Sequence, residues 1–201
     1  MDDLIAGYRR FRTTAWPERR RLFERLAERG QRPQAMVIAC ADSRVDPAMI
    51  FDAGPGEMFV VRNVANLVPP YAPDGGCHGT GAALEFGVLV LQVRHLIVLG
   101  HGLCGGIRAL LEGGPAPAGD FLGPWIAVAA PARARAMACA TANPQLAGEH
   151  AGIELSLANL LTFPWIAERV ADGRLRLHGA HFDVGSGALA LRQPDGSFVP
   201  V

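Results

Sequence analysis

The hydrophobic and polar positions of this chain divide it into short apolar runs separated by longer segments with helical spacing. Apolar runs of strand length occur at 35–40, 57–61, 95–100, 175–182 and 188–192. Helical spacing fills the stretches at 1–29, about 47–53, 79–93, from 104 onward, 124–142 and 148–171. Strands that alternate with helices predict a mostly parallel sheet. We therefore expect an α/β fold in which helices flank four parallel strands and one antiparallel edge strand.

The first 29 residues differ from the rest because arginines alternate there with apolar side chains. A basic amphipathic helix can bind a membrane or RNA. We favour instead an extended helical arm whose apolar stripe packs on the core or on a second subunit, since acidic residues dilute its charge. The Gly/Pro/Ala-rich stretch at 113–123 is interpreted as a loop, and no internal repeat is present. The expected organisation is one domain over 1–201, with an arm at 1–29 and a core at 30–201.

Composition narrows the partners that this chain can have. Half of its 201 residues are apolar, which favours a subunit interface that hides part of the surface. The formal net charge is zero, so neither nucleic acid nor an anionic membrane is expected as a partner. The chain has no lysine, which excludes Schiff-base chemistry.

The lack of a recognisable targeting signal and the spacing of the cysteines lead us to expect a reducing compartment. No apolar stretch reaches the roughly 18 residues that a membrane span needs, and the first residues lack the pattern of a signal peptide. Two of the four cysteines stand at metal-ligand spacing, so a disulfide framework is not expected. We expect a cytoplasmic protein.

Three side chains at the ends of predicted strands have the chemistry of one metal site. Cys40 ends the apolar run at 35–40, His101 follows the run at 95–100, and Cys104 completes a His-x-x-Cys spacing. Ligands bind at the carboxyl ends of strands in open parallel sheets. Two thiolates and an imidazole suit Zn²⁺, one ion per chain. Three protein ligands leave the fourth position open, which is typical of a catalytic rather than a structural zinc.

An acid and an arginine follow the first cysteine at short spacing. Asp42 and Arg44 can form a bidentate ion pair that holds the carboxylate in one orientation. We expect Asp42 to orient the water on the metal and Arg44 to keep Asp42 from binding the metal itself. A helix that begins near Gly105 would direct backbone amides at the Cys104 thiolate and at a substrate oxygen.

The combined pattern resembles the β-class carbonic anhydrases. The segments Cys40-x-Asp42-Ser43-Arg44 and His101-x-x-Cys104-Gly105-Gly106 match the two signatures of that family, and the stretches at 59–70 and 79–86 resemble those between them. The resemblance implies a zinc lyase in which zinc-bound hydroxide attacks CO₂, reversibly giving bicarbonate and a proton. It assigns zinc binding to Cys40, His101 and Cys104, and catalysis to Asp42 with Arg44.

The resemblance also suggests a branch of the family and a substrate pocket. Val37 stands where the allosteric bacterial branch has a tryptophan, so the chain is similar to the plant-like branch, with no inhibitory bicarbonate site. Members of the family form homodimers or larger assemblies of dimers, with the pocket at the subunit interface. The resemblance places Gln31, Phe59, Val64 and Phe86 in this pocket. The expected start of a helix adds Gly105.

Two other functions remain open from the sequence. Relatives of this family act on COS or CS₂, and their zinc ligands would be the same. Alternatively the zinc is structural in a non-catalytic protein, with Cys77, His78 or Asp42 as its fourth ligand. An Asp–Arg pair beside the metal has no evident purpose in such a closed site.

Overall fold

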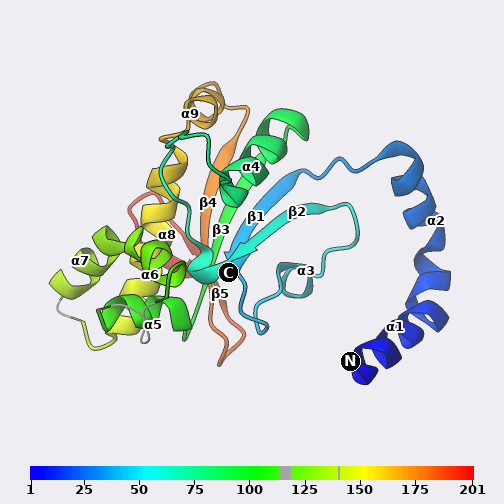
Figure 1. Ribbon diagram of the computed structural model, residues 1–201, viewed down its shortest axis with the longest axis horizontal. Helices are drawn as coiled ribbons and strands as arrows, with labels where there is room; N and C mark the ends of the chain where they lie inside the picture. The colour runs from blue at the N-terminus through cyan, green and yellow to red at the C-terminus, as the bar shows by residue number, and fades with distance from the viewer. Residues whose placement is uncertain (114–118, 140) are drawn as a thin grey trace.

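The sheet at the centre of the molecule has six strands in the order β2-β1-β3-β4-β5-β6 (Figure 1). The computed structural model describes residues 1–113, 119–139 and 141–201. The strands are β1 (Ala35–Cys40), β2 (Met58–Asn63), β3 (His95–His101), β4 (Arg176–Phe182), β5 (Leu189–Arg192) and β6 (Phe198–Pro200). The first four in spatial order are parallel, whereas β5 and β6 are antiparallel to their neighbours. The expected α/β class is confirmed, but β6 is an edge strand that the apolar pattern did not predict.

Both faces of the central strands are buried, which explains why they read as continuous apolar runs. Met36 and Ile38 of β1 belong to a core that also contains Ile153 and Leu160 of the long helix α8 (Pro144–Leu160). The alternate positions of β1 lie in a second core on the other face, where the short helix α3 (Pro47–Ile50) contributes its last residue. Every residue of β1 after the first is buried.

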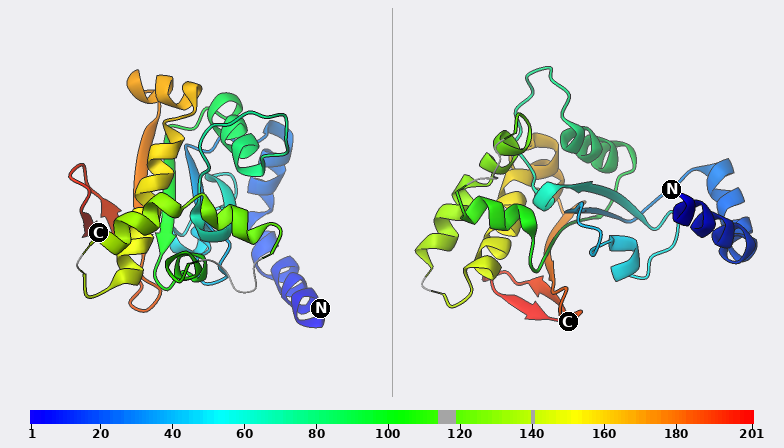
Figure 2. Two further views of the ribbon diagram at one scale, coloured as in Figure 1. Left: turned by 60° about the vertical axis from the view of Figure 1, so that its left-hand side comes forward. Right: turned by 60° about the horizontal axis from the view of Figure 1, so that its bottom comes forward.

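The remaining helices surround this sheet (Figures 1 and 2). They are α4 (Gly79–Glu85), α5 (Gly105–Leu111), α6 (Leu122–Ala127), α7 (Ala130–Ala138) and α9 (Pro164–Ala171), with a 3₁₀ turn η1 (Val64–Asn66) and a π-helical turn η2 (Phe86–Val90). Pro164 begins α9, so the single helix expected at 148–171 is two helices. Residues 114–118 of the predicted 113–123 loop lie outside the described residues. None of the described helices is long and apolar enough to span a bilayer.

The predicted N-terminal arm consists of two helices instead of one, α1 (Asp2–Thr13) and α2 (Ala15–Arg29). Pro17 explains the break, because a proline lacks an N–H and its ring collides with the carbonyl of residue 13 in a continuous helix. At the junction, the Thr14 hydroxyl donates to the Arg10 carbonyl of α1 at 2.7 Å. Neither helix has a buried residue, and both project away from the sheet (Figures 1 and 2).

The strand register places the ends of β1 and β3 at one edge of the sheet. Ala39 pairs with Leu99, so Cys40 and His101 leave the sheet side by side. On the other side of β1, Cys40 pairs with Asn63 at the end of β2. The chain segments after these three strand ends therefore meet at the same place.

Candidate metal centre

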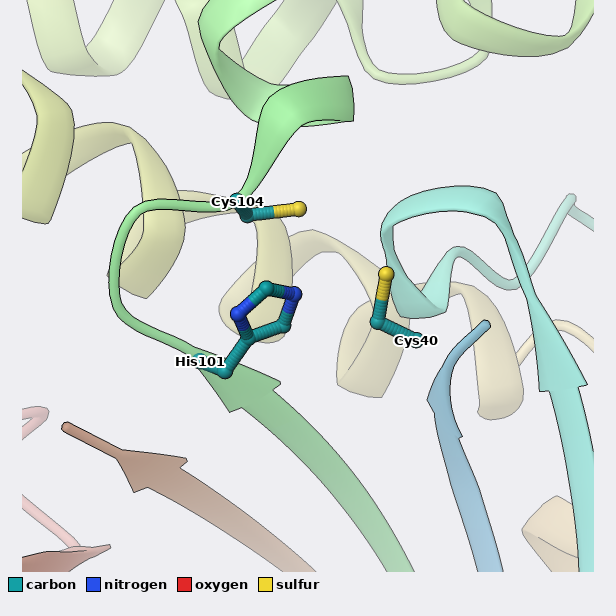
Figure 3. Close-up of side chains that lie close together, drawn as sticks. All are labelled: Cys40, His101 and Cys104. Carbon is teal, nitrogen blue, oxygen red and sulfur yellow. The ribbon is translucent and has the colours of Figure 1, made fainter. Parts of the chain in front are cut away.

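Three ligand side chains converge at this edge of the sheet (Figure 3). Cys40 ends β1, His101 ends β3, and Cys104 is the residue that precedes α5. One ligand atom from each lies within 4.8 Å of the other two, and all three residues are buried. The side chains that hydropathy and spacing selected are therefore close enough to bind one ion.

The histidine of this cluster shows that the residues fit a metal. His101 Nδ1 lies 2.9 Å from the Gly102 carbonyl oxygen, which only accepts, so Nδ1 carries the proton. Nε2 then presents a lone pair, and it is a buried side-chain nitrogen with no hydrogen-bond partner among the described residues. A buried polar atom without a partner is costly, and a cation removes that cost. Two sulfurs and one imidazole nitrogen are a donor set that zinc prefers.

The two thiols titrate as a pair. A hydrogen bond from Cys104 lowers the pKa of Cys40, and the same contact raises the pKa of Cys104. Backbone N–H groups of Ile107 and Gly106, at the start of α5, act on Cys104 in the opposite direction. A cation held between both sulfurs would favour the thiolate at each.

Asp42 and Arg44 form the bidentate pair that their spacing predicted. Arg44 Nε donates to Asp42 Oδ1 at 2.9 Å, and Nη2 donates to Oδ2 at 2.7 Å. The Arg44 backbone N–H donates to Oδ1 at 3.0 Å. These contacts with Arg44 hold the pKa of Asp42 well below its usual range, so the carboxylate is ionised. Asp42 is not part of the three-residue cluster.

Arg62 braces the segment that carries Cys40 and Asp42. Its Nε donates to the Cys40 carbonyl at 2.9 Å, and its Nη2 donates to the Asp42 carbonyl. Its Nη1 lies 3.0 Å from Asp46, whose other oxygen caps α3 at the Ala48 N–H. This part of Arg62 was not predicted from the sequence, although an arginine at the end of an apolar strand usually pairs with an acceptor.

The turn η1 borders the centre with an unusual backbone. Ala65 and Asn66 both have positive φ, at 64° and 47°, which is uncommon for residues with a side chain. The Asn63 side chain closes this turn with two hydrogen bonds to Leu67. It accepts from the Leu67 N–H at 3.0 Å and donates to the Leu67 carbonyl at 2.8 Å. A β-carbon on Gly106 would lie 2.9 Å from Ala65 Cβ. Glycine at 106 therefore lets α5 approach the turn.

The predicted pocket residues fall into two groups. Gly105 directly follows Cys104, and Val64 directly follows Asn63, which pairs with Cys40. Val64 is partly exposed, and a β-carbon on Gly105 would meet nothing within 4 Å, so the structure leaves room there.

The other group lies far from the cluster within one chain. Phe59 pairs with Met36, four residues before Cys40, which at ~3.3 Å per residue is roughly 13 Å along the strand. Phe86 contacts Phe59, with ring centroids 5.7 Å apart, and Gln31 precedes β1 altogether. One chain does not bring these three residues to the metal ligands.

Comparisons with known proteins agree with this centre. The family model for carbonic anhydrase matches residues 35–189. "Beta carbonic anhydrase 3" of Arabidopsis thaliana is 39% identical over 208 residues, covering 100% of this chain and 80% of that protein.

Solved structures give the same result. The β-carbonic anhydrase CcaA superposes with a TM-score of 0.93 at 31% identity, covering 100% of this chain and 92% of that one. A structure from a study of two tetrameric β-carbonic anhydrases of the fungus Sordaria macrospora has a TM-score of 0.74 at 29% identity, covering 94% and 92%. With its two cysteines, its histidine and its Asp–Arg pair, the chain belongs to the β-carbonic anhydrase family.

Proposed function

We propose that this protein catalyses the reversible hydration of CO₂ to bicarbonate and a proton at a zinc ion held by Cys40, His101 and Cys104. The observation that carries the proposal is the cluster of three buried ligand atoms within 4.8 Å of one another, beside an ionised Asp42 fixed by Arg44. Membership of the carbonic anhydrase family supports the same reaction.

Zinc, when bound, supplies Lewis-acid chemistry that lowers the pKa of water and provides a nucleophile near neutral pH. Asp42 accepts a hydrogen bond from the attacking water and so orients its lone pair towards the substrate carbon. Arg44 engages both carboxylate oxygens and thereby keeps Asp42 turned away from the cluster. The space over Gly105, beside the first amides of α5, is where we place a substrate oxygen.

The ligand count supports a catalytic rather than a structural ion. Cys77 is exposed, and His78 pairs with Asp74 at 2.6 Å in the loop before α4. Asp42 is engaged by Arg44. Within the described part of the chain, no fourth histidine, cysteine or acidic side chain joins the cluster. Three protein ligands leave one coordination position for the reaction.

We propose further that two chains pair to complete each pocket. The arm exposes apolar side chains, among them Leu4 and Tyr8, and both of its helices project from the core. Gln31, Phe59 and Phe86 lie too far from the cluster of their own chain to line its pocket. Pairing would bury the arm and bring these residues to the partner's metal. The tetrameric relatives from Sordaria macrospora support an assembly of dimers.

Two finer assignments complete the proposal. Val37 of β1 is fully buried in the sheet and provides no indole for an inhibitory bicarbonate, which supports the plant-like branch. None of the four cysteines forms a disulfide bond, which supports a location in a reducing compartment such as the cytoplasm.

Stopped-flow measurement of CO₂ hydration, together with zinc analysis, tests this function. The expected result is one zinc per chain and rapid hydration between about pH 7 and 9. One zinc per chain without hydration would refute the proposal and favour a structural ion. A parallel assay with CS₂ tests which substrate the enzyme uses. Turnover of CS₂ without turnover of CO₂ would show that CS₂ is the substrate.

A further inference from the structure

The peptide groups on both sides of Cys104 are held by side chains of α8. The Cys104 N–H donates to Glu149 Oε1 at 3.0 Å, and the Cys104 carbonyl accepts from Gln145 Nε2 at 3.1 Å. Gln145 Nε2 also donates to Glu149 Oε1 at 2.7 Å. Glu149 and Gln145 are one helical turn apart, so they reach Cys104 from the same face of α8. The metal ligand is thus fixed through its backbone by residues distant in sequence.

The second oxygen of Glu149 connects this backbone to the sheet. Glu149 Oε2 lies 2.9 Å from Nε2 of His181, and both residues are buried. His181 is on β4, where it pairs with Gly100, the residue before His101. One carboxylate therefore links the peptide of Cys104 to the strand beside the other ligand, His101. A residue in this position sets the spacing between the two ligands of the His-x-x-Cys segment.

The segment between these two ligands requires support, because its backbone is strained. Leu103 has φ +57° although it is not glycine, and its side chain is largely exposed, so packing does not hold it. Such a conformation persists only where the surroundings over-determine it. Gly102 is fixed by its N–H, which donates to the Phe182 carbonyl at 2.9 Å. The contacts of Cys104 with α8 fix the other end.

Glycines bring α8 close enough for these contacts. A β-carbon on Gly148 would lie 3.0 Å from Ile107 Cγ2, and one on Gly152 would lie 3.1 Å from Ile107 Cδ1. On the sheet side, a β-carbon on Gly100 would lie 2.7 Å from Ile153 Cδ1. The helix is therefore packed tightly against both α5 and β3, with Glu149 between them.

We propose that Glu149 is a positioning residue for the metal centre, which fixes Cys104 relative to His101 through its two oxygens, with Gln145 as its second anchor. This inference deepens the proposed function, since it concerns the same metal site. It does not depend on the substrate. Partners that orient metal ligands typically change metal affinity by about 10–100-fold when they are removed.

The test compares three variants of the full-length protein. Glu149→Met removes both acceptors and keeps a side chain of similar length. Glu149→Gln keeps an acceptor for the Cys104 N–H and can donate to His181. Glu154→Met is the matched control, because Glu154 is a partly buried acid of the same helix that pairs with Arg192 and not with Cys104.

The readouts are the rate of zinc release into a colorimetric chelator and the absorption spectrum of the cobalt-substituted protein, which reports thiolate geometry. We expect Glu149→Met to release zinc about 10–100-fold faster and to change the cobalt spectrum. Glu149→Gln and Glu154→Met should keep the wild-type rate and spectrum.

Wild-type release and spectrum in Glu149→Met would overturn the proposal, as would an equal change in Glu154→Met, which would indicate general loosening of α8. If Glu149→Met does not fold, Gln145→Met serves instead, since it removes the donor to the Cys104 carbonyl and to Glu149 Oε1, leaves both Glu149 oxygens in place, and should still speed release. A wild-type protein that binds zinc without hydrating CO₂ would refute the proposed function while leaving this measurement intact.

Discussion

Replacement of Arg44 by alanine separates the two tasks that the structure gives to Asp42, its charge and its orientation. Arg44 supplies three hydrogen bonds to the Asp42 carboxylate, two from its guanidinium and one from its backbone N–H. Arg44→Ala leaves only the backbone bond to Oδ1, so Oδ2 is released and the carboxylate can rotate towards the metal.

The expected loss of activity depends on whether Asp42 keeps its charge after the substitution. Without the guanidinium, the pKa of Asp42 rises towards the usual value of about 3.9, which is still far below neutral pH. Asp42 therefore stays ionised but loses its fixed orientation, and the Leu103 carbonyl loses the donor that lies 3.3 Å away on Arg44 Nη2. A positioned proton acceptor contributes about 10²–10⁴-fold to a rate. We expect kcat/KM at neutral pH to fall by that factor.

The assay is stopped-flow CO₂ hydration at neutral pH, with zinc analysis of each preparation. Arg174→Ala is the matched control: Arg174 makes the same kind of pair with Asp172, two residues earlier, through its backbone N–H at 3.1 Å and Nε at 2.6 Å. This control should keep full activity. Near-normal turnover in zinc-loaded Arg44→Ala would refute the reasoning.

Three further predictions concern stability. Gly106→Ala should lower the free energy of unfolding in urea by about 1–3 kcal/mol, because its β-carbon would lie 2.9 Å from Ala65 Cβ, whereas Gly105→Ala meets open space and should not; equal losses would contradict this packing argument. Burial lowers the pKa of His150 to about 4, below the usual value of ~6.5, so the unfolded chain binds more protons between these values and stability should fall as pH decreases through that window. His150→Phe keeps the stack on Phe198 and should flatten this part of the Tm–pH curve, and an unchanged curve would assign the acid sensitivity to other groups. Removal of zinc by a chelator should lower Tm and re-addition should restore it, since an ion at 100 times its Kd stabilises the folded state by about 2.7 kcal/mol; a Tm independent of zinc would show that the ion binds too weakly to matter.

The sequence predicted the parts of the centre that depend on local pattern. Cys40 and His101 end apolar runs, and parallel strands bring such ends together, so hydropathy alone placed them side by side. The Asp42–Arg44 pair followed from two-residue spacing and the geometry of a guanidinium. The Asp46-Pro47 dipeptide is another local signal, because Asp46 caps α3 and Pro47 is its first residue.

Features that depend on distant contacts were not predicted. Glu149 reads as an ordinary acid on a helix, because nothing in its neighbourhood indicates a partner 45 residues earlier. The strand β6 has only three residues, although the Asp195-Gly196 turn before it is a hairpin signal. Pro17 was a local signal for the break between α1 and α2, and the helical periodicity on both sides concealed it.

The order in which the metal ligands and Glu149 occur along the chain has a consequence for how the centre assembles during translation. The last zinc ligand, Cys104, precedes Glu149 by 45 residues. At a synthesis rate of about 5–20 residues per second, Cys104 leaves the peptidyl-transferase centre roughly 2–9 s before Glu149, and Cys40 and His101 leave earlier still. During that interval Glu149 is not available to hold the Cys104 peptide. We therefore expect the His-x-x-Cys segment to reach its final geometry only late in synthesis, when α8 packs against α5.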